Sequence, residues 1–498
     1  MNVNPITRLD YPDPDVIRVE DTYYMVSTTM HFMPGCEILQ SFDLVHWEHV
    51  TYVYETLDHT DAQQLKSGQN IYGQGMWAAS LRYHEGRFYI CFVANDTRKT
   101  YLYTSEKIDG PWKKQLIEGF YHDGSLLFDE DGRNYIVYGN DEIWITELNE
   151  DLTAPKKDGL HRLLVSDHKN PELGYEGSHI QKINGYYYIF LIHSLRDRWM
   201  RTEACFYSDS LEGEFTGGDV LCDDRGYCGQ GVAQGGIVDT PDGKWYAMLF
   251  QDFGAVGRIP ILLPVTWKDH FPVFGQNGHV PEEIEVHSTR PGYIYQPLVG
   301  SDDFCNGLLP RWQFNHDPDP RYYHLDALQG TYTITTREVC TELTQAVNTL
   351  TQRMSYPSCA AEVTVDASAL KEGDVAGLCA LQSCYAAVGI TKHHGKYEVL
   401  MLDKKEDGIL DMTERTVVES HQMDFRLEAD FCNMKDEARC YYRVNKGDWL
   451  PIGTVHKLYF KLDHFTGCRF GLFCYAAEET GGSACFRDFK YYDVDEIS

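Results

Sequence analysis

The sequence predicts an all-β protein, a five-bladed β-propeller followed by a β-sandwich. Its 34 Tyr, 23 Phe and 9 Trp stand beside 42 Gly, a composition that favours strands and tight turns over helices. One hairpin pattern recurs five times in the first part of the chain, and strands of a different style fill the rest. Because 498 residues exceed what one compact core usually holds, more than one domain is expected.

The recurring hairpin defines the predicted blades. In each copy a turn residue, usually Gly, is followed by an aromatic pair and an apolar strand, and the second aromatic residues lie 46 to 65 positions apart. These residues are Tyr24, Tyr89, Tyr135, Tyr188 and Tyr246. A strand precedes each turn and several copies continue into an outer strand, which gives about three to four strands per unit. Five such units fit radial blades better than a sandwich, with a plain meander of hairpins as the alternative.

A second domain follows the last repeat. The hairpin pattern stops near Gly278, and the proline-bearing stretch after it shows no strong period. From Asp302 onward short alternating strands with Asp-Gly and His-Gly turns resume, which is typical of a β-sandwich. We therefore predict a propeller over residues 1–285, a linker over 286–301 and a sandwich over 302–498.

The charge balance excludes several classes of partner. With 44 Lys and Arg against 75 Asp and Glu the formal net charge is -31, which repels nucleic acid. No stretch of about 18 apolar residues and no export signal is recognisable, so no membrane association is expected. The 15 cysteines lack Cys-x-x-Cys spacing, which is typical of reduced thiols, and we expect a cytoplasmic location.

Three carboxylates stand where predicted blades begin. Asp13 lies between two prolines before the first inner strand, Asp123 opens the third blade and Glu176 opens the fourth. Inner strands line the channel of a propeller, so these side chains are expected to converge. An inverting glycosidase needs a general base and a general acid about 6.5 to 9.5 Å apart, and a third carboxylate can raise the pKa of the acid. Each motif alone is more often a turn, and that alternative remains open.

The residues resemble family 43 glycoside hydrolases across nearly the whole chain. The segments that carry this resemblance in the predicted propeller are Asn4-Pro5-Ile6, Tyr11-Pro12-Asp13-Pro14-Asp15-Val16-Ile17, Asp43-Leu44-Val45-His46-Trp47, Trp77-Ala78-Ala79-Ser80, Asp123-Gly124-Ser125-Leu126, Glu176-Gly177-Ser178-His179, Gln234-Gly235-Gly236-Ile237-Val238-Asp239-Thr240 and Gly254-Ala255-Val256-Gly257-Arg258. Trp312-Gln313-Phe314-Asn315-His316, Asn348-Thr349-Leu350-Thr351-Gln352-Arg353 and Gly373-Asp374-Val375-Ala376-Gly377-Leu378 resemble the concanavalin-like C-terminal sandwich of the β-xylosidase type.

The resemblance implies a role for each candidate site residue. Asp13 is expected to be the general base, Glu176 the general acid, and Asp123 the carboxylate that tunes the pKa of the acid and orients it. Arg258 is expected to hold sugar hydroxyls, and Trp77 to form a wall of the sugar pocket. A surface ion pair and blade-core packing are the respective alternatives for the last two.

The resemblance also bears on cofactors and on departures from the family pattern. It implies that no cofactor is required and allows a bound calcium, with no metal ligands assigned. Gln234 stands where many relatives have a His associated with a central ion or water, which puts that calcium in doubt. Asp15 stands where many relatives have Ser, and we expect it to point into the surroundings of the first strand.

The activity implied by the resemblance is that of an inverting exo-glycosidase. It would remove terminal β-D-xylosyl or α-L-arabinofuranosyl residues, or both, from xylo- and arabino-oligosaccharides, and the sandwich type favours xylosides. An enzyme that is mainly an α-L-arabinofuranosidase, an endo-arabinanase and a carbohydrate-binding propeller without catalysis are the alternatives. The expected partner is a small oligosaccharide, with a homo-oligomer as an open option.

Overall fold

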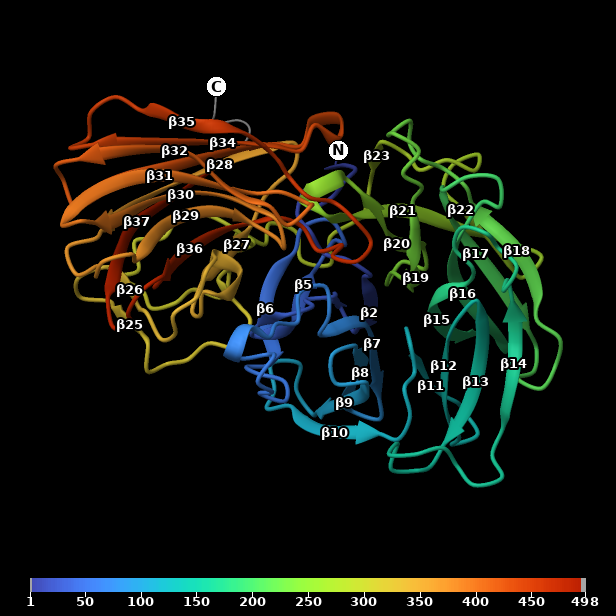
Figure 1. Cartoon of the computed structure of the whole chain (residues 1–498). Coiled ribbons are helices and arrows are strands. Elements are labelled where there is room, and N and C mark those ends of the chain that lie inside the picture. The colour runs from blue at the N-terminus through green and yellow to red at the C-terminus, as the bar shows by residue number, and fades with distance from the viewer. Residues whose placement is uncertain (1, 494–498) are drawn as a thin grey trace.

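The computed structural model describes residues 2–493 and confirms a five-bladed propeller followed by a β-sandwich (Figure 1). Met1 and residues 494–498, the outer ends of the two predicted domains, lie outside the described residues. Within residues 2–493, no helix is both long and apolar enough to cross a bilayer. In Figure 1 the sandwich, drawn in orange and red, lies beside the blue first blade.

Each blade is a four-stranded antiparallel sheet of consecutive strands. The first contains β2 (Asp15–Val19), β3 (Thr22–Val26), β5 (Gly35–Ser41) and β6 (Glu48–Tyr54). The second contains β7 (Met76–His84), β8 (Arg87–Ala94), β9 (Lys99–Ser105) and β10 (Lys113–Ile117). The third contains β11 (Ser125–Phe128), β12 (Asn134–Asn140), β13 (Glu142–Leu148) and β14 (His161–Ser166). The fourth contains β15 (Glu176–Ile183), β16 (Tyr186–Ser194), β17 (Arg201–Ser208) and β18 (Thr216–Leu221). The fifth contains β19 (Ala233–Asp239), β20 (Trp245–Asp252), β21 (Arg258–Lys268) and β22 (Phe271–Phe274). The repeated tyrosines lie on β3, β8, β12, β16 and β20, the second strand of every blade.

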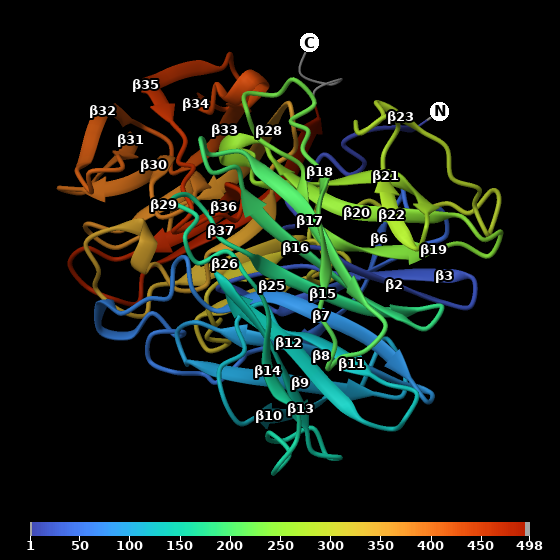
Figure 2. The same ribbon diagram turned by 90° about the vertical axis from the view of Figure 1, so that its right-hand side faces the viewer.

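The innermost strands form a closed ring around the channel. β2 contacts β7 on one side and β19 on the other, and β11 and β15 complete the circle (Figure 1). Figure 2 shows the same strands after a 90° turn. The first residues are tied to the last blade, because β1 (Asn2–Val3) pairs with β23 (Glu283–Ile284). The Asn4 side chain also donates to the carbonyl of Leu262 at 2.7 Å and accepts its N–H at 3.0 Å. These contacts hold the segment leading into β2 at the channel mouth.

The channel is filled in its middle by a polar network. Asp15 accepts hydrogen bonds from the Arg82 guanidinium at 2.8 Å and from the Leu81 N–H at 2.7 Å, and His179 Nδ1 lies 3.1 Å from its other oxygen. Arg82 also donates to the Ser125 hydroxyl at 2.6 Å. Asp15 thus points across the channel, where it links the first blade to the second and fourth.

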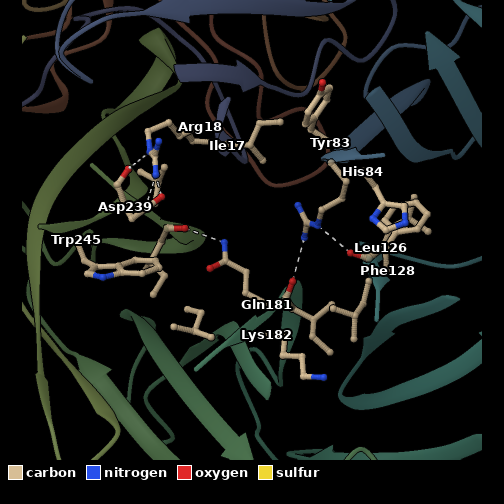
Figure 3. A pocket seen from close by; sticks show the side chains of 17 residues that line it. Ile17, Arg18, Tyr83, His84, Leu126, Phe128, Gln181, Lys182, Asp239 and Trp245 are labelled. Atoms are coloured by element: carbon tan, nitrogen blue, oxygen red, sulfur yellow. Dashed lines mark hydrogen bonds and ion pairs between the residues drawn. The ribbon is translucent and has the colours of Figure 1, made fainter. Parts of the chain in front are cut away.

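The two ends of the channel carry different side chains. The ends of the inner strands line a cavity of about 410 Å³ (Figure 3). There Arg18 forms an ion pair with Asp239, and Gln181 donates to the carbonyl of Ile237 at 2.7 Å. Since its charged and amide groups are engaged within the protein, we assign no ligand to this cavity. The starts of the same strands carry Asp13, Asp123 and Glu176 at the other end.

The sandwich packs two antiparallel sheets face to face. One has the order β32-β31-β30-β29-β36-β27-β24-β4 and the other β25-β26-β37-β28-β33-β34-β35. Their strands are β4 (Phe32–Met33), β24 (Gln313–Asn315), β25 (Tyr323–Asp326), β26 (Thr331–Thr335), β27 (Leu350–Arg353), β28 (Ser358–Asp366), β29 (Val375–Leu381), β30 (Tyr385–His393), β31 (Lys396–Lys404), β32 (Leu410–Val418), β33 (Gln422–Asp430), β34 (Glu437–Val444), β35 (Leu450–Lys457), β36 (Arg469–Tyr475) and β37 (Ser483–Asp493). Short 3-10 helices are η1 (Lys66–Gly68), η2 (Gly254–Val256), η3 (Leu343–Gln345) and η4 (Cys432–Met434).

The two domains share one core. β4 comes from the first blade yet forms the edge of the larger sandwich sheet, with Met33 opposite Phe314 and Phe32 opposite Asn315. The Arg469 guanidinium lies 3.4 Å above the ring of Phe32. One buried hydrophobic cluster continues from the fifth blade into the sandwich. The sequence pattern did not indicate this exchange, because a two-residue strand has no readable period.

Candidate active site

One pocket of about 200 Å³ collects all five candidate site residues at the starts of propeller strands. Asp13 precedes β2, Trp77 lies near the start of β7, Asp123 precedes β11, Glu176 opens β15 and Arg258 opens β21. The remaining lining residues are His122, Leu173, Trp199, Arg201, Gln234, Leu462 and Phe465. The side chains converge because the inner strands of the first four blades, and β21 as the third strand of the fifth blade, begin at the same channel mouth.

Asp13 is fixed in one orientation by two donors. It has a φ of 52° between Pro12 and Pro14 and is buried. The Thr28 hydroxyl donates to Oδ2 at 2.5 Å, while the Ala78 N–H donates to that hydroxyl oxygen at 2.9 Å. Arg258 Nη1 donates to Oδ1 at 2.6 Å. These bonds leave a carboxylate whose remaining lone pairs face the pocket and can accept a proton.

Glu176 and Asp123 form a cluster with His122. The Asn140 amide donates to Glu176 Oε2 at 2.7 Å, and the Gly177 N–H donates to Asp123 Oδ2 at 3.0 Å. Nε2 of His122 lies 3.5 Å from Glu176 Oε2 and 3.6 Å from Asp123 Oδ2. The imidazole therefore lies between the two carboxylates, a position that the sequence motifs did not indicate.

The pKa values of this cluster depend on burial and on His122. Burial, reinforced by the charge of Glu176, raises the pKa of Asp123 to about 6. Burial opposes a charge on His122, but the two carboxylates outweigh it and raise the pKa of His122 to about 9. Burial also favours neutral Glu176, yet His122 and the nearby arginines outweigh that effect and lower its pKa. This direction differs from the expected raising of the Glu176 pKa by Asp123, because the imidazolium of His122 lies 3.5 Å from Glu176 Oε2.

Two arginines converge on one buried aspartate beside the cluster. Asp252, at the end of β20, forms an ion pair with Arg201 and lies 3.3 Å from Nε of Arg258. Burial and the neighbouring Arg258 lower the pKa of Arg201 to about 9. Arg258 is therefore fixed between Asp13 and Asp252 rather than in a surface ion pair. Arg201 and Asp252 carry no motif, and only their position as charged residues at the termini of apolar strands could have indicated them.

The aromatic wall of the pocket comes from both domains. Trp77 and Phe465 meet edge to face, with ring centroids 5.1 Å apart at an interplanar angle of 68°. The Phe465 ring also lies 3.7 Å from the guanidinium of Arg258. Phe465 and Leu462 belong to the segment between β35 and β36, so the sandwich completes the pocket. Trp77 thus faces the pocket rather than a blade core.

The side chains present do not fit the calcium that the family resemblance allows. Calcium takes roughly six to eight oxygen ligands. In residues 2–493, the one group of His, Cys, Asp or Glu donors close enough to share an ion, within 4.8 Å, is His122, Asp123 and Glu176. This group offers one imidazole nitrogen and two carboxylates that already accept hydrogen bonds from N–H groups. The centre of the channel is occupied by the Arg82 guanidinium. The described cluster therefore offers too few free oxygen ligands for calcium.

Comparison with known proteins agrees with this geometry. Residues 3–272 match the model of the glycosyl hydrolases family 43, and residues 301–492 match the β-xylosidase C-terminal concanavalin A-like domain. The chain is similar to a β-xylosidase of Formosa agariphila, with 27% identity covering 99% of this chain and 89% of that protein. It is similar to a non-reducing-end α-L-arabinofuranosidase of Bacteroides ovatus, with 24% identity covering 82% and 79%.

A solved structure, a bifunctional GH43-CE protein of Bacteroides eggerthii, is similar with a TM-score of 0.92 and 42% identity over 99% of this chain. The chain spans 64% of the length of that structure. The family model alone covers more than half of the chain, and the pocket lies within the matched residues except for Leu462 and Phe465. The chain therefore belongs to the glycosyl hydrolases family 43.

Proposed function

We propose that this glycoside hydrolase is an inverting exo-enzyme that releases single terminal β-D-xylosyl or α-L-arabinofuranosyl residues from short oligosaccharides. The observation that carries the proposal is the small pocket, where carboxylates from three blades face an aromatic wall formed by Trp77 of the propeller and Phe465 of the second domain. A volume of about 200 Å³ is below the range of pockets that hold drug-sized ligands and suits one sugar ring.

The contacts of the three carboxylates support a separate role for each of them. Asp13 accepts a proton from a water molecule, whose oxygen attacks the anomeric carbon as the glycosidic bond breaks. Glu176 gives its proton to the departing oxygen. Asp123 holds the Gly177 N–H and thereby fixes the backbone next to Glu176. Arg258 binds sugar hydroxyls while it orients Asp13.

His122 supplies the proton that Glu176 needs in this proposal. At 3.5 Å from Glu176 Oε2, the imidazolium can pass its Nε2 proton to the carboxylate. The N–H bond breaks as the O–H bond forms, and the same proton then moves to the leaving oxygen. The pair therefore titrates as one unit, with macroscopic pKa values that belong to both residues.

The sugar preference is proposed from the names of the relatives and from the second domain. A β-xylosidase and an α-L-arabinofuranosidase are both similar to the chain, and the sandwich matches the β-xylosidase type. We place β-D-xylosides first and α-L-arabinofuranosides second. The segment carrying Leu462 and Phe465 closes the pocket wall, which favours exo-action over the open groove that an endo-arabinanase requires.

The test is turnover of nitrophenyl β-D-xyloside, nitrophenyl α-L-arabinofuranoside, xylo-oligosaccharides and linear arabinan, with the first product anomer followed by NMR. The proposal expects single pentoses and inversion. Retention would contradict the base role of Asp13. Fragments released from within arabinan would indicate an endo-enzyme, and binding of xylobiose without hydrolysis would indicate a carbohydrate-binding propeller.

We also propose that the enzyme acts in the cytoplasm on imported oligosaccharides. The fifteen cysteines of the described part of the chain are free thiols, a state that a reducing compartment maintains. Cell fractionation with an antibody tests the location. A homo-oligomer remains part of the proposal, and size-exclusion chromatography with light scattering tests it.

A further inference from the structure

One buried carboxylate joins the two domains beside the pocket. Asp10 is 2% exposed and lies three residues before Asp13. Its Oδ1 accepts the backbone N–H of Arg258 at 2.8 Å, and its Oδ2 accepts the backbone N–H of Gly467 at 2.7 Å. Arg258 belongs to the fifth blade and Gly467 to the sandwich, so each domain occupies one oxygen of the same carboxylate.

Both partners of Asp10 lead directly to the pocket. The side chain of Arg258 binds Asp13, and Phe465 lies two residues before Gly467. The ring of Phe465 in turn covers the Arg258 guanidinium at 3.7 Å. Hydrogen bonds from N–H groups to an ionised carboxylate are about twice as strong as neutral ones. The Asp10 carboxylate therefore holds the backbone at Arg258 and the backbone at Gly467, the two segments that carry the guanidinium and the Phe465 ring.

The two segments approach so closely that side chains would not fit between them. Gly257 has a φ of 103°, and a Cβ at this position would lie 2.1 Å from Asp10 Oδ1. A Cβ on Gly467 would lie 2.0 Å from the carbonyl oxygen of Val256. The Cys468 N–H adds a hydrogen bond to the carbonyl of Ala255 at 2.8 Å. The domains thus meet backbone to backbone beside the carboxylate of Asp10.

We propose that Asp10 is a positioning residue that sets the sandwich-borne Phe465 against Arg258 and so determines the width of the sugar pocket. This inference rests on the proposed role of the pocket as a terminal-sugar site. Asp10 does not line the pocket, and it acts through the backbones of Arg258 and Gly467.

The chain offers a matched control. Asp436 is also a buried carboxylate that crosses this interface, where its Oδ1 accepts the Ala255 N–H at 3.1 Å. Ala255 does not line the pocket. Asp10→Asn and Asp436→Asn each turn one acceptor oxygen into an N–H donor at the same interface. Asp10→Asn should raise KM by roughly tenfold or more with a smaller change in kcat, whereas Asp436→Asn should keep both within about twofold.

A double-mutant cycle tests whether Asp10 acts through the aromatic wall. Phe465→Ala should raise KM in the wild type and add little in the Asp10→Asn background, because the wall is already displaced there. Additive effects on KM would overturn the proposal. An increase in KM in Asp10→Asn that Asp436→Asn reproduces would also overturn the proposal, since a merely structural role predicts the same increase for both variants.

Hydrogen exchange gives a readout that needs no substrate. In the wild type, the amides of Arg258 and Gly467 should be protected, and Asp10→Asn should accelerate their exchange by roughly tenfold while Asp436→Asn leaves them protected. Rapid exchange of these amides in the wild type overturns the proposal even if Asp10→Asn fails to fold. If the wild type cleaves no xyloside or arabinofuranoside, the proposed function fails, and the exchange data still decide the role of Asp10.

Discussion

His464 is expected to make the folded enzyme sensitive to acid, and His464→Leu should relieve that sensitivity. The side chain is 3% exposed between the domains, in a cluster with His31, whose ring centroid lies 5.2 Å away. Neither nitrogen of the His464 ring has a hydrogen-bond partner. Burial lowers the pKa of His464 from 6.5 to about 4. The imidazole is therefore neutral in the fold where the unfolded chain would carry a proton.

The magnitude follows from linkage. Between pH 6.5 and 4 the unfolded chain binds a proton at this position and the folded chain does not, so stability falls as the pH falls through this window. For His464 alone the loss is about 2 kcal/mol at pH 5 and about 3.4 kcal/mol below pH 4. Buried carboxyls such as Asp10 and Asp436, whose pKa values burial raises to about 6, shift the whole curve in the opposite direction. Only the difference between wild type and variant isolates the histidine.

The assay is thermal unfolding of both proteins from pH 8 to pH 5. Leucine has a similar size, and the substitution breaks no hydrogen bond, so the variant should be at least as stable at pH 8. Its advantage should then grow as the pH falls below 6.5. His324→Leu, at an exposed strand position, controls for the loss of an imidazole as such. A stability difference that stays constant from pH 8 to pH 5 would refute the reasoning.

Three further outcomes test the site. Glu176→Ala should lower kcat on xylobiose by roughly 10² to 10⁴, and far less on a dinitrophenyl xyloside, whose leaving group needs no proton. Asp13→Ala should abolish turnover of both substrates. If Glu176→Ala lowered kcat equally on the two substrates, that result would contradict its acid role. The alkaline limb of the wild-type kcat/KM profile is expected near pH 9, because the two carboxylates raise the pKa of His122 to about 9. His122→Gln should move this limb by more than one pH unit toward acid, because Glu176 alone then holds the proton. An unmoved limb would exclude proton sharing. Phe465→Ala should raise KM by about tenfold through loss of its contacts with Arg258 and Trp77, measured by steady-state kinetics; an unchanged KM would mean that the ring does not touch the sugar.

The blades and the three carboxylates could be predicted because their signals are local. A tyrosine recurs on the second strand of every blade, and the strand that precedes it must begin at the channel mouth. Asp13, Asp123 and Glu176 therefore converge in any propeller that has this repeat. Arg258 and Trp77 were indicated by family resemblance, and they line the same pocket.

The features that escaped prediction arise from contacts between distant segments. Phe465 reaches the pocket from a segment without strand periodicity, nearly four hundred residues after Trp77. His122 neighbours a predicted residue, but its effect on Glu176 depends on a 3.5 Å separation across two blades. The lowered pKa of Glu176 could not be foreseen, because the net sign depends on burial and three cations at once.

The donated strand β4 separates the genetic boundary of the domains from their physical boundary. Cutting the gene after the fifth blade would leave Phe32 and Met33 on the propeller side and strip the larger sandwich sheet of its edge. A sandwich domain exchanged by recombination must therefore have a sheet edge that pairs with Phe32 and Met33 of the original propeller. Two residues near the N-terminus thus require the propeller and the sandwich to evolve together. The same constraint applies when the two domains of this enzyme are exchanged by protein engineering.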